Sequence, residues 1–166
     1  MALISTKIIS LLQERIKHEE ANSKLYLQMG YWLDLQGYNN AAKLYAEHSK
    51  DELQHKQWAV EHLLSLNILP NEPAEDQPQL EFKGLQQIIA LTYKRELDTT
   101  NEVKELAKVA FEEGDLMTFD LGQRYVKEQI EEMDAAQALV DQLETFGDGQ
   151  VEMKLLDNWI GENLLG

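Results

Sequence analysis

The amino-acid sequence predicts an all-α protein: a four-helix bundle with one long crossover connection and a short fifth helix at its C-terminal end. Apolar residues recur at steps of three and four along most of the chain, and no segment alternates with a period of two. Residues that favour helices are abundant, whereas all three prolines lie within residues 70–78. A chain of 166 residues is long enough for one sizeable core, so we expect residues 1–166 to form a single domain.

Five helices are predicted, at about residues 5–36, 40–67, 82–113, 116–146 and 151–164. Gly37 ends the first helix and Gly114 the third, because glycine readily adopts the left-handed conformation that closes a helix. Asn39 and Asp115 follow these glycines, and each is expected to cap the N-terminus of the next helix. A Gly-Asp-Gly sequence at residues 147–149 separates the fourth helix from the fifth.

The lengths of the connections predict the topology of the bundle. The first and third connections are tight turns, so each joins an antiparallel pair of helices. The second connection, residues 68–81, spans roughly 46 Å when extended, about the length of a 30-residue helix. It is therefore long enough to cross the whole bundle and start the third helix parallel to the second. The alternative is an unstructured linker between two helical hairpins, although each hairpin alone has little core.

Composition excludes several classes of function. The formal charge of −15, from 30 acidic and 15 basic residues, argues against binding to nucleic acid and favours attraction of cations, although solubility alone explains many acidic surfaces. The chain has no cysteine, which excludes disulfides and thiolate metal sites and fits a cytoplasmic location. No apolar run is long enough for a signal peptide or a membrane span, so no membrane partner is expected.

Polar residues interrupt the apolar stripe of each long helix near its middle. They are Glu19 in the first helix, Glu52 and His55 in the second, Glu96 in the third, and Gln129 and Glu132 in the fourth. The i, i+3 spacing puts Glu52 and His55 on one helix face, and it does the same for Gln129 and Glu132. Inward-facing carboxylates are costly to bury unless they are paired or bind a cation.

The intervals between these residues repeat in the two halves of the chain. Glu19 precedes Glu52 by 33 residues and His55 by 36, and Glu96 precedes Gln129 and Glu132 by the same two intervals. A single buried Glu or His is usually a satisfied core residue, and one Glu-x-x-His motif occurs often by chance. Matched intervals on four helices instead predict a metal centre, with a structural polar layer as the alternative.

The types of ligand narrow the choice of metal. Carboxylates with one imidazole and no thiolate suit Fe, Mn or Zn. Glu52 is placed to bridge two metal ions, and Glu residues with Glu-x-x-His motifs on a helical bundle are the ligand pattern of di-iron and di-manganese carboxylate proteins. An oxidase that acts on an organic substrate with such a centre is therefore one possible function.

Four segments of the sequence resemble the bacterial non-haem ferritins. They are Glu19–Tyr26, Asp51–His55, Tyr93–Glu96 and Tyr125–Glu132. The resemblance covers essentially the whole chain, including the crossover and the fifth helix. It implies that the protein stores iron and is a ferroxidase, which oxidises Fe(II) with dioxygen or hydrogen peroxide. It also implies that 24 subunits form a hollow shell that holds a ferric oxide-hydroxide mineral.

The resemblance also implies roles for individual residues. The first iron position would use Glu19, Glu52 and His55 with Gln129 nearby, the second would use Glu52, Glu96 and Glu132, and Tyr26 would lie beside the centre. A third iron site on the inner surface would use Glu128, Glu131 and Glu132 with Asp51. Asp51 stands where the family usually has Glu, and the shorter side chain reduces its reach.

Two positions separate this chain from the related bacterioferritins, which bind haem. Those proteins carry Glu-x-x-His on the fourth helix, where this sequence has Gln129 and Glu132, and they hold haem with a Met that follows the second-helix Glu. Here that position is Leu53, which cannot ligate iron, so no haem is expected. His48, one turn before Glu52, is either an outer partner of the metal ligands or an ordinary polar residue.

Overall fold

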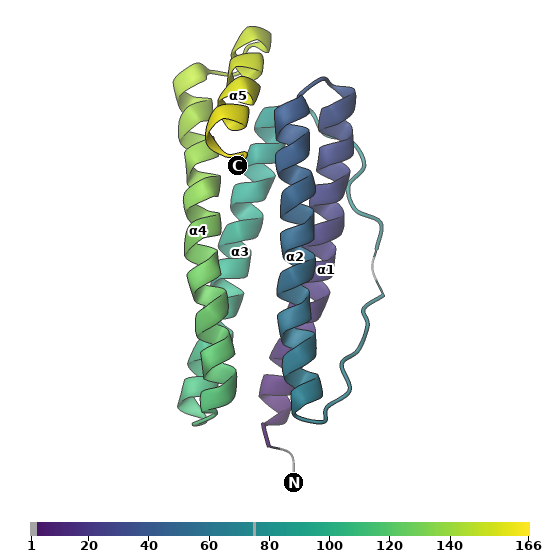
Figure 1. Ribbon diagram of the computed structural model, residues 1–166, viewed down its shortest axis with the longest axis vertical. Coiled ribbons are helices and arrows are strands. Elements are labelled where there is room, and N and C mark those ends of the chain that lie inside the picture. The colour runs from purple at the N-terminus through teal and green to yellow at the C-terminus, as the bar shows by residue number, and fades with distance from the viewer. Residues whose placement is uncertain (1–2, 75) are drawn as a thin grey trace.

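The computed structural model describes residues 3–74 and 76–166, which form an all-helical structure. Its helices are α1 (Thr6–Leu35), α2 (Asn39–Ser65), α3 (Leu85–Glu112), α4 (Leu116–Phe146) and α5 (Gln150–Asn163). The predicted fold class is confirmed, because four long helices form a bundle and the short α5 lies at one end of it (Figure 1). In the part of the chain that is described, no helix is both long and apolar enough to cross a bilayer.

The connection between α2 and α3 runs the length of the bundle, so that α2 and α3 point in the same direction (Figure 1). It is attached to α1 at two places. Gln13 pairs with the main chain of the connection through a bond to the Leu69 oxygen at 3.4 Å and a bond from the Asn71 nitrogen at 3.0 Å. Further along, the Gln28 amide donates to the Leu80 oxygen at 3.2 Å. The crossover prediction is thus confirmed.

Helix α3 begins at Leu85, whereas the sequence predicts a start at about residue 82. Phe82 continues the apolar pattern of the helix, and it is buried against Trp32 with ring centroids 5.9 Å apart. Phe82 reaches the core from the end of the crossover. The apolar spacing thus predicted that its side chain is buried, but not that its backbone lies outside the helix.

The prediction that Asn39 caps α2 is wrong, because Asn39 is the first residue of the helix and Tyr38 precedes it without a side-chain cap. The cap comes from α5, where the buried Asp157 accepts a hydrogen bond from the Ala41 nitrogen at 2.8 Å. Asp115 does cap α4, accepting from the Thr118 nitrogen at 3.1 Å. A carboxylate from another helix thus supplies the cap that the local sequence was expected to provide.

The apolar core forms two clusters, one toward each end of the bundle. The cluster near α5 includes Tyr26, Met29, Leu33, Leu85, Ile89 and Leu156, and the other includes Ile8, Leu12, Ile16, Leu63, Val103 and Leu106. Glu19 lies between Ile16 and Tyr26 on α1, and Glu96 lies between Ile89 and Val103 on α3. The interruption of the stripes seen in the sequence therefore corresponds to a polar layer near mid-bundle.

Candidate metal centre

The polar layer contains buried side chains from all four long helices. Five of the predicted ligand residues are between 1% and 5% exposed: Glu19, Glu52, His55, Glu96 and Gln129. Glu132 is half-buried beside them. Burying several carboxylates together is unfavourable unless protons, cations or hydrogen-bond donors compensate them, so this layer is suited to bind cations.

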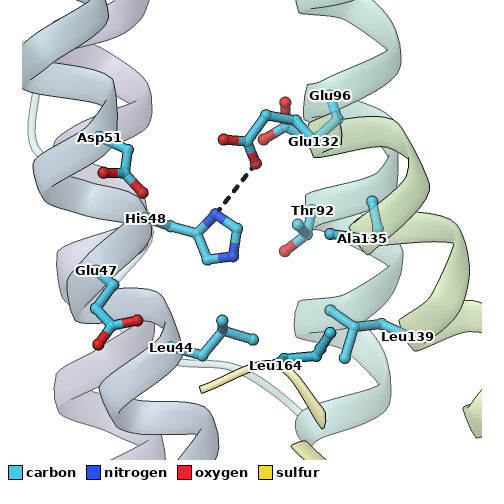
Figure 2. Close-up of a pocket in the computed structure, with 11 residues that line it drawn as sticks. Leu44, Glu47, His48, Asp51, Thr92, Glu96, Glu132, Ala135, Leu139 and Leu164 are labelled. Atoms are coloured by element: carbon cyan, nitrogen blue, oxygen red, sulfur yellow. Dashed lines mark ion pairs between the residues drawn. The ribbon is translucent and has the colours of Figure 1, made fainter. Parts of the chain in front are cut away.

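On the side of α3 and α4, two carboxylates face the middle of the bundle (Figure 2). Glu96 accepts hydrogen bonds from the Tyr26 hydroxyl and from the Gln129 amide, the latter at 2.6 Å. Glu132 points at the His48 imidazole of α2, with Oε2 3.5 Å from Nδ1. Gln129 therefore contacts Glu96, whereas the sequence suggested a place near the first iron position.

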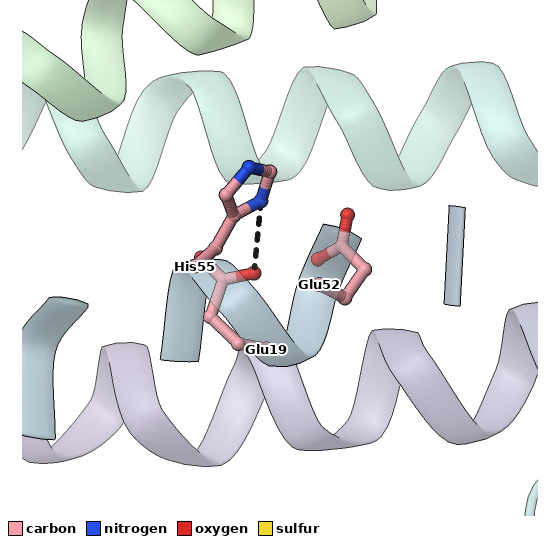
Figure 3. A group of neighbouring side chains, drawn as sticks. All are labelled: Glu19, Glu52 and His55. Carbon is pink, nitrogen blue, oxygen red and sulfur yellow. Dashed lines mark ion pairs between the residues drawn. The ribbon is translucent and has the colours of Figure 1, made fainter. Parts of the chain in front are cut away.

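On the side of α1 and α2, Glu19, Glu52 and His55 lie together (Figure 3). One donor atom from each lies within 4.8 Å of the others, and Glu19 Oε2 is 4.0 Å from His55 Nδ1. Ligands about 2.0–2.2 Å from an ion are at most about 4.4 Å apart, so small side-chain rotations complete a site. Both Glu19 oxygens are buried and accept no aligned hydrogen bond among the described residues, although the Arg15 guanidinium lies 2.7 Å from Oε1.

The residues assigned to a third iron site do not form one cluster. His55, Glu128 and Glu132 form a second group of donor atoms within 4.8 Å, and Glu128 Oε1 lies 3.5 Å from His55 Nε2. Asp51 is exposed and lines a cavity of about 190 Å³ with Glu132 and His48. Glu131 is exposed and takes part in none of the ion pairs of the described residues. The structure thus brings Glu128 to the main centre and leaves Glu131 apart.

The carboxylates of this layer differ in pKa because their surroundings differ. Burial first, and then the charges of Glu19, Glu96 and Glu132, raise the pKa of Glu52 well above its usual range. Burial and Glu132 also raise the pKa of Glu96, although its hydrogen bond from Tyr26 opposes this. Burial alone would raise the pKa of Glu132, but the neighbouring His48 outweighs it, so this pKa is lowered.

Glu52 lies between the two halves of the layer. Its pKa responds to Glu19 on one side and to Glu96 and Glu132 on the other. Asn22 donates to Glu52 Oε2 at 3.4 Å and to the Thr99 hydroxyl at 3.3 Å, which ties α1 to α2 and α3 at this level. A carboxylate in this place is suited to bridge two cations.

Several neighbours of the candidate ligands were not among the site residues predicted from the sequence. Arg15 is buried with Nε 2.7 Å from Glu19 Oε1, and its i, i+4 spacing from Glu19 was a usable signal. The Trp58 ring lies 4.9 Å from the His55 ring, and the Tyr125 hydroxyl donates to the His55 carbonyl at 2.5 Å. Trp58 is one turn after His55 on α2, so its proximity was also open to prediction.

The chain is similar to known proteins over most of its length. A family model described as a ferritin-like domain matches residues 9–146. A probable bacterial non-haem ferritin-like protein of Haemophilus influenzae is 33% identical over 159 residues, which cover 96% of each chain. The chain belongs to the ferritin family. The bacterial non-haem ferritin of Escherichia coli is 30% identical to this ferritin over 145 residues, covering 87% of this chain and 88% of the relative.

The fold of this ferritin also matches solved structures. An open pore ferritin from the archaeon Archaeoglobus fulgidus superposes with a TM-score of 0.90 at 26% identity, covering 96% of this chain and 98% of the other. The resemblance to the bacterial non-haem ferritins is thereby confirmed, and the relatives support a role of this chain in iron storage.

Proposed function

We propose that this ferritin oxidises Fe(II) at a di-iron centre inside each subunit and stores the ferric product as a mineral inside a hollow shell. The first iron position is formed by Glu19, Glu52 and His55, and the second by Glu52, Glu96 and Glu132. The observation that supports this proposal most strongly is the buried group of Glu19, Glu52 and His55, whose donor atoms lie within 4.8 Å of one another.

The chemistry of the proposed reaction balances with iron as substrate. Each of two Fe(II) ions gives up one electron, and dioxygen takes both electrons with two protons to form hydrogen peroxide. Each Fe(III) then reacts with two water molecules to form FeO(OH) and three protons. Carboxylates favour the oxidation because Fe(III) is a harder cation than Fe(II), and oxygen ligands stabilise it more strongly.

The remaining predicted residues have supporting roles in this proposal. Tyr26 and Gln129 hold Glu96 by hydrogen bonds, so that its carboxylate faces the second position. Glu128 contacts His55 and is partly exposed, so it is placed to take up the ferric product. A third position with Asp51 and Glu131 stays a prediction. The cavity beside Glu132, about 190 Å³, is smaller than the roughly 300–1,000 Å³ of typical organic ligand sites, and it gives no support to an oxidase acting on an organic substrate.

Self-association is part of the proposal, with a shell of 24 subunits as the expected assembly. Three large apolar side chains, Leu27, Tyr31 and Leu35, follow one another at steps of four on the outside of α1 and are exposed. A contiguous exposed apolar patch is a common feature of surfaces that contact another protein. A contact between subunits through α1 would cover it.

Oxygen uptake during aerobic addition of Fe(II) tests the catalytic part of the proposal. Glu52→Ala and His55→Ala are each expected to lower the initial rate by at least about 10- to 100-fold, because even outer partners of metal ligands have effects of that size. Glu61→Gln removes an exposed acid from the same helix and is the control, with an unchanged rate. Rates equal to wild type in both ligand variants would contradict the assignment.

A further inference from the structure

A buried arginine lies directly against one of the proposed iron ligands. Arg15 is 2% exposed, its Nε lies 2.7 Å from Glu19 Oε1, and its Nη1 lies 2.5 Å from Glu102 Oε2 on α3. His18 Nδ1 lies 2.8 Å from the same Glu102 oxygen. One guanidinium therefore links a buried carboxylate of the centre to a half-exposed carboxylate outside it.

The contact between Arg15 and Glu19 is electrostatic and lacks hydrogen-bond alignment. Although the atoms are close, Arg15 Nε and Nη2 and both Glu19 oxygens are buried without a hydrogen-bond partner among the described residues. The bond to Glu102, in contrast, has hydrogen-bond geometry. No aligned hydrogen bond from Arg15 therefore fixes the Glu19 carboxylate, and the attraction between the two groups is one of charge.

A metal ion at the first position and Arg15 require the same carboxylate. An arginine keeps its positive charge at all relevant pH values, so it attracts Glu19 and repels an incoming cation whenever it lies next to the site. Like charges at short range interact strongly where water is excluded. Arg15 thus opposes cation binding, whereas the carboxylates of the polar layer favour it.

We propose that Arg15 is a positioning residue that lowers the affinity of the first iron position by competing with the cation for Glu19. Glu102 sets the strength of this competition, because it draws the guanidinium outward toward α3. The inference rests on the proposed function, since it needs a cation at Glu19. A weakened first position binds iron reversibly and releases its product, which suits a centre that passes iron on.

Anaerobic titration of the metal-free protein with Co²⁺, followed by calorimetry and by Co²⁺ absorption, measures this affinity without catalysis. Arg15→Gln is expected to tighten one of the two binding steps by about tenfold or more, the scale on which outer partners alter metal affinity. Lys17→Gln removes the same charge from an exposed site on α1 and is expected to bind like wild type.

Glu102→Gln keeps the test decisive if Arg15→Gln folds poorly, and a His55→Ala background supplies a further control. Glu102→Gln leaves the guanidinium with Glu19 as its main partner, so it is expected to weaken the same step. The effect of Arg15→Gln is expected to vanish in a His55→Ala background, where the first position has lost a ligand. Arg15→Gln binding Co²⁺ no more tightly than wild type, or Glu102→Gln binding no more weakly, would overturn the inference.

The titration also separates the inference from the proposed function. A wild-type protein that binds no Co²⁺ at the centre contradicts the proposed function itself. A wild-type protein that binds two ions per chain, with unaltered binding in Arg15→Gln, contradicts only the role of Arg15.

Discussion

Glu52 is the residue at which the requirements of folding and of the proposed iron binding conflict most directly. It is 2% exposed, and burial with three neighbouring carboxylates raises its pKa well above the usual range. Burial in the metal-free protein therefore disfavours the charge of this carboxyl, whereas the proposed iron binding requires the ionised form. A cation that binds here replaces a proton, so we expect iron binding to weaken as the pH falls.

The raised pKa of Glu52 predicts a dependence of stability on pH in the metal-free protein. A carboxyl whose pKa is higher in the folded state contributes stability below its unfolded pKa, about 4.3, and loses it as the pH rises through the folded pKa. Glu52→Gln resembles the protonated form at every pH. It is expected to match wild type near pH 4 and to exceed it near pH 7 by about 1–3 kcal/mol, the cost of an uncompensated buried polar group.

Thermal unfolding with a metal chelator present, at several pH values, checks this expectation. The matched control is Glu61→Gln, which lies on the exposed face of α2 and should follow wild type at each pH. If the difference in stability between Glu52→Gln and wild type does not grow with pH, the claim that the charge of Glu52 destabilises the metal-free protein is wrong.

Spacing along the helices predicts which residues face inward but not what they meet. Glu19 and Glu96 are buried as the interrupted stripes indicate, because an i, i+7 position returns to the same helix face. The contacts from Arg15 to Glu102 and from His55 to Glu128 depend on the phase of one helix against another and on side-chain rotamers. Neither property is encoded in the spacing of a single helix.

At the scale of the helices, the N-terminus of α2 depends on α5. Asp157 is buried at the end of the bundle, and it accepts hydrogen bonds from the Ala41 nitrogen at 2.8 Å and from the Asn40 amide at 3.4 Å. Lys154 of α5 donates to the Gly37 carbonyl at 2.6 Å in the adjoining turn. The start of one helix and the docking of another are therefore coupled.

Asp157→Ala tests this coupling. Loss of a capping carboxylate costs about 0.5–2 kcal/mol, and a protein of this size loses about 2–4 °C of melting temperature per kcal/mol. We therefore expect a drop of several degrees in a thermal melt of the metal-free protein. Asp148→Ala, in the exposed turn before α5, is the control and should leave the melting temperature unchanged. Equal melting temperatures for the two variants would contradict the capping role.

Helix boundaries followed from the sequence wherever local signals determine them. Gly37 and Gly114 adopt φ angles of 74° and 71° after α1 and α3, as expected of glycines that end helices. The cap of α2 did not follow, because its partner Asp157 is 116 residues from Ala41 in the chain. Residues next to a helix end predict it well, except where a side chain distant in the sequence supplies the capping hydrogen bond.

At the scale of the whole molecule, the proposed shell depends on surfaces that the single chain leaves uncovered. Tyr31 is 58% exposed in the middle of the apolar stripe on α1. Tyr31→Asp places a charge where a neighbouring subunit would pack, and we expect it to shift the protein from the full assembly to small oligomers in gel filtration with light scattering. Tyr31→Phe keeps the apolar surface and should assemble normally. An intact shell in Tyr31→Asp would show that this stripe is not a subunit contact.

The division of the core into two apolar clusters with a polar layer between them is the feature on which the proposed function depends. Without a ligand, such a layer costs stability, and a purely apolar core would fold at least as well. We therefore propose that the layer exists to bind cations, which is the central claim for this ferritin.

The most direct test of that claim is a crystal of the protein soaked anaerobically in ferrous salt and measured on both sides of the iron absorption edge. We expect two anomalous peaks on opposite sides of Glu52, one in contact with Glu19 and His55 and the other with Glu96 and Glu132. A map without anomalous density in the polar layer, with those carboxylates still paired as in the metal-free protein, would contradict the account.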